Sequence, residues 1–68
     1  MIRVVIYPDG RELKYDPRKR KITVKKLLQD LGYNSLQVIV VRKKELLTED
    51  VFIFDGEEID VYEVTSTG

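Results

Sequence analysis

The chain has 68 residues, and its twelve Lys and Arg residues balance twelve Asp and Glu residues to a formal net charge of zero. A chain of this length forms one small domain with little interior. The sequence contains neither cysteine nor histidine, which excludes disulfides, thiolate metal sites and the Ser-His-Asp or Cys-His arrangements of nucleophilic enzymes. We therefore expect no bound cofactor, no metal and no enzymatic activity of the chain's own.

The charges are segregated along the chain. Residues 1–44 carry a net charge of +8 and residues 45–68 a net charge of −8. Charged residues make up 35% of the sequence while Asn, Gln and Cys are rare or absent, a composition typical of proteins from hot environments. No apolar run approaches the roughly twenty residues that span a membrane, and no secretory signal opens the chain. We expect a soluble cytoplasmic protein with no membrane partner.

A β-hairpin is predicted at the start of the chain. Residues 2–7 are mostly β-branched or aromatic, which favours a strand. Pro8-Asp9-Gly10 then predicts a turn, because proline fixes one backbone angle and glycine adopts a positive φ at little cost. Residues 11–15 return as the second strand of the hairpin.

A short helix is predicted after a polar connection over residues 16–21. Thr23 has the hydroxyl of an N-cap, and Gly32 is suited to end the helix in a left-handed conformation. Between them, four apolar residues follow the i, i+3, i+4, i+7 spacing of one helical stripe: Val24, Leu27, Leu28 and Leu31. The predicted helix therefore covers residues 24–31.

Two strands are predicted after the helix, followed by an apolar segment that forms either a short turn or a strand. The apolar run at residues 38–41 suits a central strand that is buried on both faces, and Lys43-Lys44 turns it into residues 45–47. Residues 51–54 form a second apolar segment, in which we expect Phe52 and Phe54 to belong to the core.

The last predicted strand follows a tight turn at Asp55-Gly56. Its alternation puts Ile59 and Val61 on one face and Asp60 and Tyr62 on the other.

The order of these elements predicts an α+β fold: a β-grasp (ubiquitin-like) roll in which one helix packs across a four- to five-stranded mixed sheet. The first and last strands are expected to be parallel neighbours at its centre. We expect residues 1–64 to form the domain and residues 65–68 a flexible C-terminal tail. The predicted core consists of Val4, Ile6, Leu13, Val24, Leu27, Leu28, Leu31, Val40, Phe54, Ile59 and Val61.

The sequence resembles the small sulfur-carrier proteins of the ThiS/MoaD class, which have the ubiquitin-like fold. The resemblance covers nearly the whole chain and rests on the order and spacing of three segments. These are the helix at residues 23–32, the strand at residues 38–41 with its hairpin, and Phe54-Asp55-Gly56-Glu57-Glu58-Ile59-Asp60-Val61. The acidic turn and the strand after it form the family's most recognisable segment.

This resemblance implies a carrier protein rather than an enzyme. In the family, an E1-like enzyme uses ATP to adenylate the C-terminal glycine carboxylate, which then becomes a thiocarboxylate for sulfur transfer (thiamine, molybdenum cofactor or tRNA thiolation) or forms an isopeptide bond. Gly68 is thereby the activated residue, and Thr65, Ser66 and Thr67 form the tail that the partner binds. The implied partners are the E1-like adenylating enzyme and a sulfur-accepting synthase or target protein, and we expect a monomer when the chain is free.

One departure from the family keeps a second function open. The family ends in Gly-Gly, whereas Thr67 precedes Gly68 in this sequence. A β-branched residue restricts the backbone and adds bulk where the channel of an activating enzyme is narrow. The alternative function is therefore a ubiquitin-like protein-binding module without C-terminal activation.

Three other features of the sequence have two interpretations each. The basic run at residues 18–21, continued by Lys25 and Lys26, could contact RNA or an acidic partner. The chain has no basic excess overall and no aromatic stacking platform next to this run, so we expect a solvated loop and helix face and no nucleic-acid partner. The four tyrosines either form an exposed patch on the sheet or take ordinary packing positions: Tyr7, Tyr15, Tyr33 and Tyr62. Five carboxylates alternate along the chain without the spacing of a cation-binding loop, which indicates a solvated acidic face: Asp50, Asp55, Glu57, Glu58 and Asp60.

Overall fold

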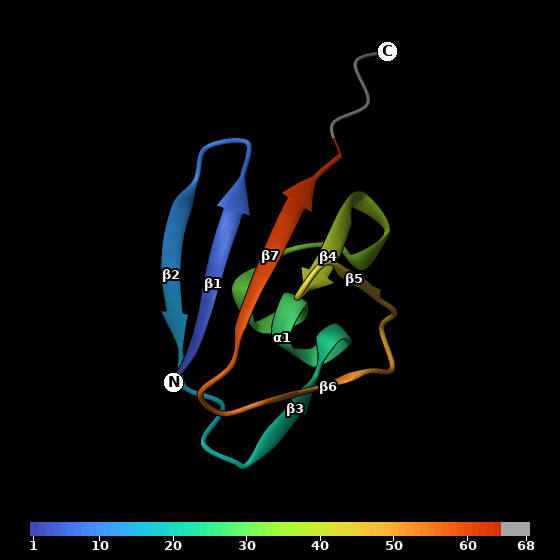
Figure 1. The fold of residues 1–68 in the computed structure, drawn as a ribbon. Coiled ribbons are helices and arrows are strands. Elements are labelled where there is room, and N and C mark those ends of the chain that lie inside the picture. Colours follow the sequence, from blue (N-terminus) through green and yellow to red (C-terminus); the bar gives the residue numbers. More distant parts are fainter. Residues whose placement is uncertain (65–68) are drawn as a thin grey trace.

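The computed structural model describes residues 1–64, in which one helix packs on a five-stranded mixed sheet (Figure 1). The strands are β1 (Ile2–Tyr7), β2 (Arg11–Tyr15), β3 (Lys21–Thr23), β4 (Val38–Arg42), β5 (Glu45–Leu47), β6 (Phe52–Phe54) and β7 (Glu58–Glu63), and the helices are α1 (Val24–Leu31) and a 3₁₀ turn (Ser35–Gln37). The order in the large sheet is β2-β1-β7-β4-β5, while β3 and β6 form a separate two-stranded ribbon. The predicted α+β class and the single helix are thus confirmed.

The centre of the large sheet is a parallel pair, β1 and β7. Their register runs from Arg3 opposite Glu58 to Tyr7 opposite Tyr62. All other strand pairs of the sheet are antiparallel, including β4 with β7. The predicted central pairing of the first and last strands is therefore confirmed, and β7 lies between β1 and β4 (Figure 1).

The helix has the predicted bounds and the predicted caps. The Thr23 hydroxyl accepts a hydrogen bond of 3.2 Å from the backbone N–H of Lys26. Gly32 ends the helix at φ 87°, and its N–H donates to the carbonyl of Gln29 at 3.1 Å. The left-handed conformation at Gly32 satisfies a carbonyl group that the last turn would otherwise leave unpaired.

The core lies between α1 and the inner face of the large sheet, and the β3–β6 ribbon closes one end of it. The buried apolar side chains are Ile2, Val4, Ile6, Ile22, Val24, Leu27, Leu28, Val40, Ile53, Ile59 and Val61. Eight of the eleven predicted core residues are in this set, and two more, Leu13 and Leu31, pack against it while partly exposed.

The prediction that Phe52 and Phe54 belong to the core is wrong. Their exposed fractions are 41% and 48%, whereas Ile53 between them is completely buried. The reason is the alternation of the three-residue strand β6: if the middle side chain points into the core, both neighbours point out.

The prediction that β4 is buried on both faces is also wrong. Val40 is 3% exposed, but Ile39 is 43% exposed, because α1 covers one face of the sheet and no described element covers the other. A further strand, β3, lies where the sequence indicated the end of a polar connection. The predicted tail at residues 65–68 lies outside the described residues. Within residues 1–64, no helix has the length and apolar character needed to cross a membrane.

Candidate functional site

The face of the sheet away from α1 carries an apolar row at the end of β7. Ile6, Val61 and Val40 point into the core, so strand alternation turns the residues on either side of each of them to the opposite, outer face. In register, Tyr7 lies opposite Tyr62, and Tyr62 lies opposite Ile39. Three neighbouring strands thus contribute one side chain each to what we call the outer row: Tyr7, Tyr62 and Ile39.

The outer row contains a stacked aromatic pair and remains accessible. The rings of Tyr7 and Tyr62 stack with their centroids 4.7 Å apart and an interplanar angle of 13°. Tyr62 remains 41% exposed and Ile39 43% exposed. A shallow hollow of about 540 Å³ adjoins the stack, and it is lined by Tyr7, Pro8, Asp9, Tyr62 and Glu63. The stacked pair restricts the motion of both rings, which makes them suitable contact residues for a partner protein.

The apolar character of the outer face continues away from this row. Val5 and Val41 flank Asp60 on the neighbouring strands, and Leu46 of β5 lies opposite Val41. Leu46 is 72% exposed. The outer face therefore combines aromatic and aliphatic side chains with the carboxylates of Asp60, Glu58 and Glu12, of which Glu58 and Glu12 are paired with Arg3.

The C-terminal end of β7 is fixed at the same end of the sheet as the outer row. Val38 pairs with Glu63, and the backbone N–H of Val64 donates to the carbonyl of Gln37 at 2.9 Å. Four predicted site residues, Thr65, Ser66, Thr67 and Gly68, follow directly and lie outside the described residues.

The four tyrosines do not form one patch, because Tyr15 and Tyr33 pack at the edge of the core. The Tyr33 hydroxyl accepts a hydrogen bond of 3.0 Å from Arg11 Nη2. The Tyr15 hydroxyl donates to Asp30 Oδ2, and this hydrogen bond raises the pKa of Tyr15 to about 12. The same bond, with Lys26 close by, holds the pKa of Asp30 below its usual range. Of the four tyrosines, Tyr7 and Tyr62 are the two that belong to the outer row.

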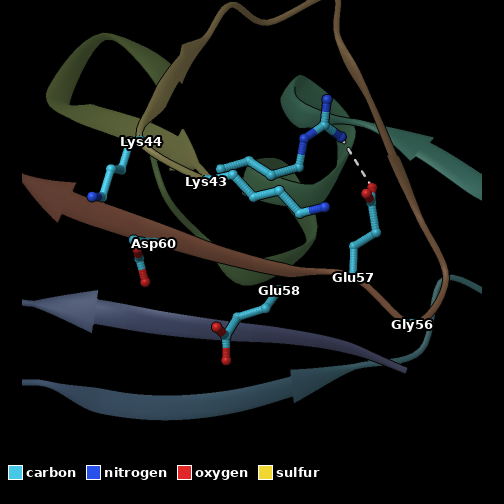
Figure 2. Close-up of a pocket in the computed structure, with 7 residues that line it drawn as sticks. Lys43, Lys44, Gly56, Glu57, Glu58 and Asp60 are labelled. Atoms are coloured by element: carbon cyan, nitrogen blue, oxygen red, sulfur yellow. Dashed lines mark hydrogen bonds and ion pairs between the residues drawn. The ribbon is translucent and has the colours of Figure 1, made fainter.

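The acidic segment that opens β7 is solvated and lies beside basic side chains. Figure 2 shows Lys43 and Lys44 across a hollow of about 420 Å³ from Glu58 and Asp60. Arg42 Nη1 lies 3.0 Å from Glu57 Oε1, and Arg3 Nη1 lies 2.6 Å from Glu58 Oε2. The opposite charges of the two halves of the chain therefore cancel in part where these side chains meet.

Glu57 also has a structural role at this position. The oxygen that pairs with Arg42 accepts the backbone N–H of Phe54 at 2.8 Å, and Arg42 donates in addition to the carbonyl of Phe52 at 2.9 Å. These bonds fix β6 and the turn at Gly56, whose φ is 91°. Across residues 1–64, no group of three His, Cys, Asp or Glu side chains is placed to hold a metal ion.

The side chains of the outer face are suited to binding a partner protein. Its aromatic and aliphatic side chains can pack against a partner, and Asp60 can fix the orientation of a basic group on it. A scan against protein-family models gave no match to this chain, and a search of the curated proteins gave none either.

Proposed function

We propose that the chain is a β-grasp carrier protein or modifier that is activated at the carboxylate of Gly68. In this proposal an E1-like enzyme binds the outer row and receives residues 65–68 in its active site. The carboxylate of Gly68 attacks the α-phosphorus of ATP and displaces pyrophosphate. Hydrosulfide then displaces AMP to give a thiocarboxylate, or a lysine amine displaces AMP to give an isopeptide bond.

One structural observation carries the proposal: the end of β7 lies beside an exposed apolar row. A carrier needs a binding surface next to the residues that it presents, because docking then converts activation into an intramolecular step. The stacked Tyr7–Tyr62 pair and Ile39 supply such a surface. The mixed sheet with a central parallel pair and one packed helix is compatible with the β-grasp arrangement. The resemblance to ThiS/MoaD proteins supplies the chemistry.

The test is intact mass spectrometry of the protein purified from its native host. The expected product is a species about 16 Da heavier than the unmodified chain, in which sulfur replaces one oxygen at Gly68, or a lysine-linked adduct through Gly68. The measurement also establishes whether Gly68 is the last residue of the mature protein, which the proposal requires. Absence of both products, together with no adenylate formed by any E1-like enzyme of the host, contradicts the proposal.

The second candidate function is a protein-binding module without C-terminal activation, and the outer row within residues 1–64 favours it. A chain that lacks residues 66–68 distinguishes the two functions. If the truncated chain retains all activity and partner binding, the module is supported. If the full chain is adenylated and the truncated chain binds the same enzyme without being adenylated, the carrier is supported. Leu36→Ser serves as the control for surface changes, since Leu36 is 88% exposed and lies outside the outer row.

A further inference from the structure

The β3–β6 ribbon has one buried face and one exposed face. Its register joins Lys21 with Phe54, Ile22 with Ile53, and Thr23 with Phe52. Ile22 is 8% exposed and Ile53 is 0% exposed, so alternation turns the other side chains of both strands outward. The exposed face of the ribbon thus presents Phe52, Phe54 and Lys21 together.

The two phenylalanines are neighbours on this open face. Side chains two residues apart on a strand lie about 7 Å from each other. Within residues 1–64 the one stacked aromatic pair is Tyr7 with Tyr62, so Phe52 and Phe54 stack on no other ring. The contact that Phe52 does make is cationic, with Lys21 Nζ 4.2 Å from the centroid of its ring. Both rings keep a surface on which a flat group can stack.

Unpaired positive charge lies beside Phe52. Among the described residues, none of the four consecutive bases at residues 18–21 forms an ion pair with a carboxylate. A hollow of about 270 Å³ beside Phe52 is lined in part by Lys19, Lys21 and Lys26. Lys26 is paired with Asp30 at 3.2 Å, which leaves Lys19 and Lys21 as the free cations of the hollow. We call Lys19, Lys21, Phe52 and Phe54 the basic–aromatic face.

This face is remote from the outer row. Figure 1 shows β3 and β6 at one end of the molecule and the C-terminal end of β7 at the other. A ligand on the basic–aromatic face would therefore leave the outer row accessible.

We propose that the basic–aromatic face binds single-stranded nucleic acid. Phosphates would lie against Lys19 and Lys21, and successive bases would stack on Phe52 and Phe54. Single-strand-binding surfaces combine a positive track for the backbone with aromatic rings for the bases. The acidic side chains of a peptide would satisfy the lysines but have no flat rings for the phenylalanines, whereas every nucleotide joins a phosphate to a base, so the combination favours nucleic acid. The sequence analysis expected no aromatic stacking platform beside the basic run at residues 18–21. The β3–β6 pairing brings the ring of Phe52, which is distant in the chain, to Lys21.

The test measures binding of a fluorescein-labelled oligouridylate of about twelve nucleotides to the full chain by anisotropy, over a range of salt concentrations that begins near 50 mM. Phe52→Ala and Phe54→Ala are each expected to weaken binding by about fivefold or more, the usual effect of losing one stacked base. Lys19→Gln with Lys21→Gln is expected to reduce the slope of log K against log salt by about 1.4. The matched controls are Lys43→Gln with Lys44→Gln for charge and Leu46→Ala for an exposed apolar side chain. Circular dichroism and urea unfolding establish that each variant is folded.

The proposal is supported if the phenylalanine and lysine variants of the face lose affinity while both controls bind as the parent chain does. It is overturned by no binding at the lowest salt concentration, or by an equal loss in the Lys43 and Lys44 control, which would indicate attraction by general charge. It is also overturned if Phe52→Ala and Phe54→Ala bind normally. Equally tight, competitive binding of polyglutamate would overturn it in favour of an acidic protein partner.

Discussion

The ring of Tyr62 stacks on the ring of Tyr7 at a centroid distance of 4.7 Å, although the two residues come from the last and first described strands. The stack exists only when β1 and β7 are paired, so the outer row is assembled by the same pairing that closes the centre of the sheet. Folding and the proposed binding surface are coupled at these two side chains.

Tyr62→Ala is expected to weaken binding of the activating enzyme by more than it destabilises the fold. Loss of the stacked pair costs about 1 kcal/mol of stability, whereas an aromatic contact residue at an interface can contribute about 2 kcal/mol or more. Calorimetric titration with the enzyme and urea unfolding measure the two effects. Tyr62→Phe keeps the stack and should retain most of the affinity; an unchanged affinity in Tyr62→Ala would remove the outer row from the interface.

Ile53→Ala is expected to lower the free energy of unfolding by about 3 kcal/mol, because the side chain is completely buried and its loss leaves a cavity. Phe54→Ala removes a larger side chain but is expected to cost less than about 1 kcal/mol, since substitutions at exposed positions have small effects. Urea unfolding midpoints at constant m-value compare the two. A larger loss of stability in Phe54→Ala than in Ile53→Ala would indicate that Phe54 is buried in the core.

Replacing Lys43-Lys44 by Asn-Gly is expected to stabilise the β4–β5 hairpin by about 1 kcal/mol. Both lysines have positive φ, 51° and 68°, in a two-residue turn between the paired residues Arg42 and Glu45. Side chains other than glycine and asparagine adopt this conformation at a cost. Thermal unfolding provides the measurement.

The control for this prediction is Lys43→Ala with Lys44→Ala, which removes the same charges and keeps the unfavourable backbone. If the alanine variant is stabilised as much as the Asn-Gly variant, the gain comes from charge and not from the turn.

One tyrosine is expected to ionise near pH 12 in an ultraviolet absorbance titration, and Tyr15→Phe should remove this step. Because the pKa of Tyr15 is raised in the folded chain from 10.0, its contribution to stability is complete below pH 10 and is lost as the pH rises toward 12. The lowered pKa of Asp30 has the opposite sign: its contribution is present above the ordinary carboxyl pKa and is lost as the pH falls. Asp30→Asn should lower the pKa of Tyr15, and an unchanged value would show that the hydrogen bond is absent in solution.

Thr67→Gly is expected to raise the rate of adenylation by an E1-like enzyme that accepts Gly-Gly ends, by on the order of tenfold or about 1.4 kcal/mol in barrier. Pyrophosphate release measures this rate. Thr65→Gly is the matched control, since it makes the same change two residues further from Gly68. A rate that falls with Thr67→Gly would indicate an enzyme adapted to threonine at this position.

The sequence predicted those elements whose local pattern is long enough to be unambiguous. The eight-residue helix, with Thr23 and Gly32 at its ends, agrees in every bound, and the alternation of Ile59 and Val61 in β7 identifies the inner face correctly. Strand β6 has three residues and all of them are apolar, so the sequence does not show which of its side chains face the core.

The functional surfaces were harder to predict because they depend on pairing between distant segments. Ile39 lies on an open face only because one helix covers one side of the sheet. Tyr7 joins Tyr62, and Phe52 joins Lys21, through strand registers that no local pattern encodes. Tyr15 and Tyr33 have the same residue type as Tyr7 and Tyr62, yet they pack at the edge of the core.

The position of β7 between β1 and β4 has a consequence for synthesis on the ribosome. The β1–β2 hairpin and α1 emerge early, but the strand that separates β1 from β4 is made after both of them. Until β7 leaves the exit tunnel, β1 has no partner strand on the side of Ile59 and Val61. The nascent chain then exposes the apolar side chains of Val4 and Ile6 and an open strand edge. The sheet is therefore completed only after β7 has left the exit tunnel, and cellular factors that shield exposed strand edges act before that point.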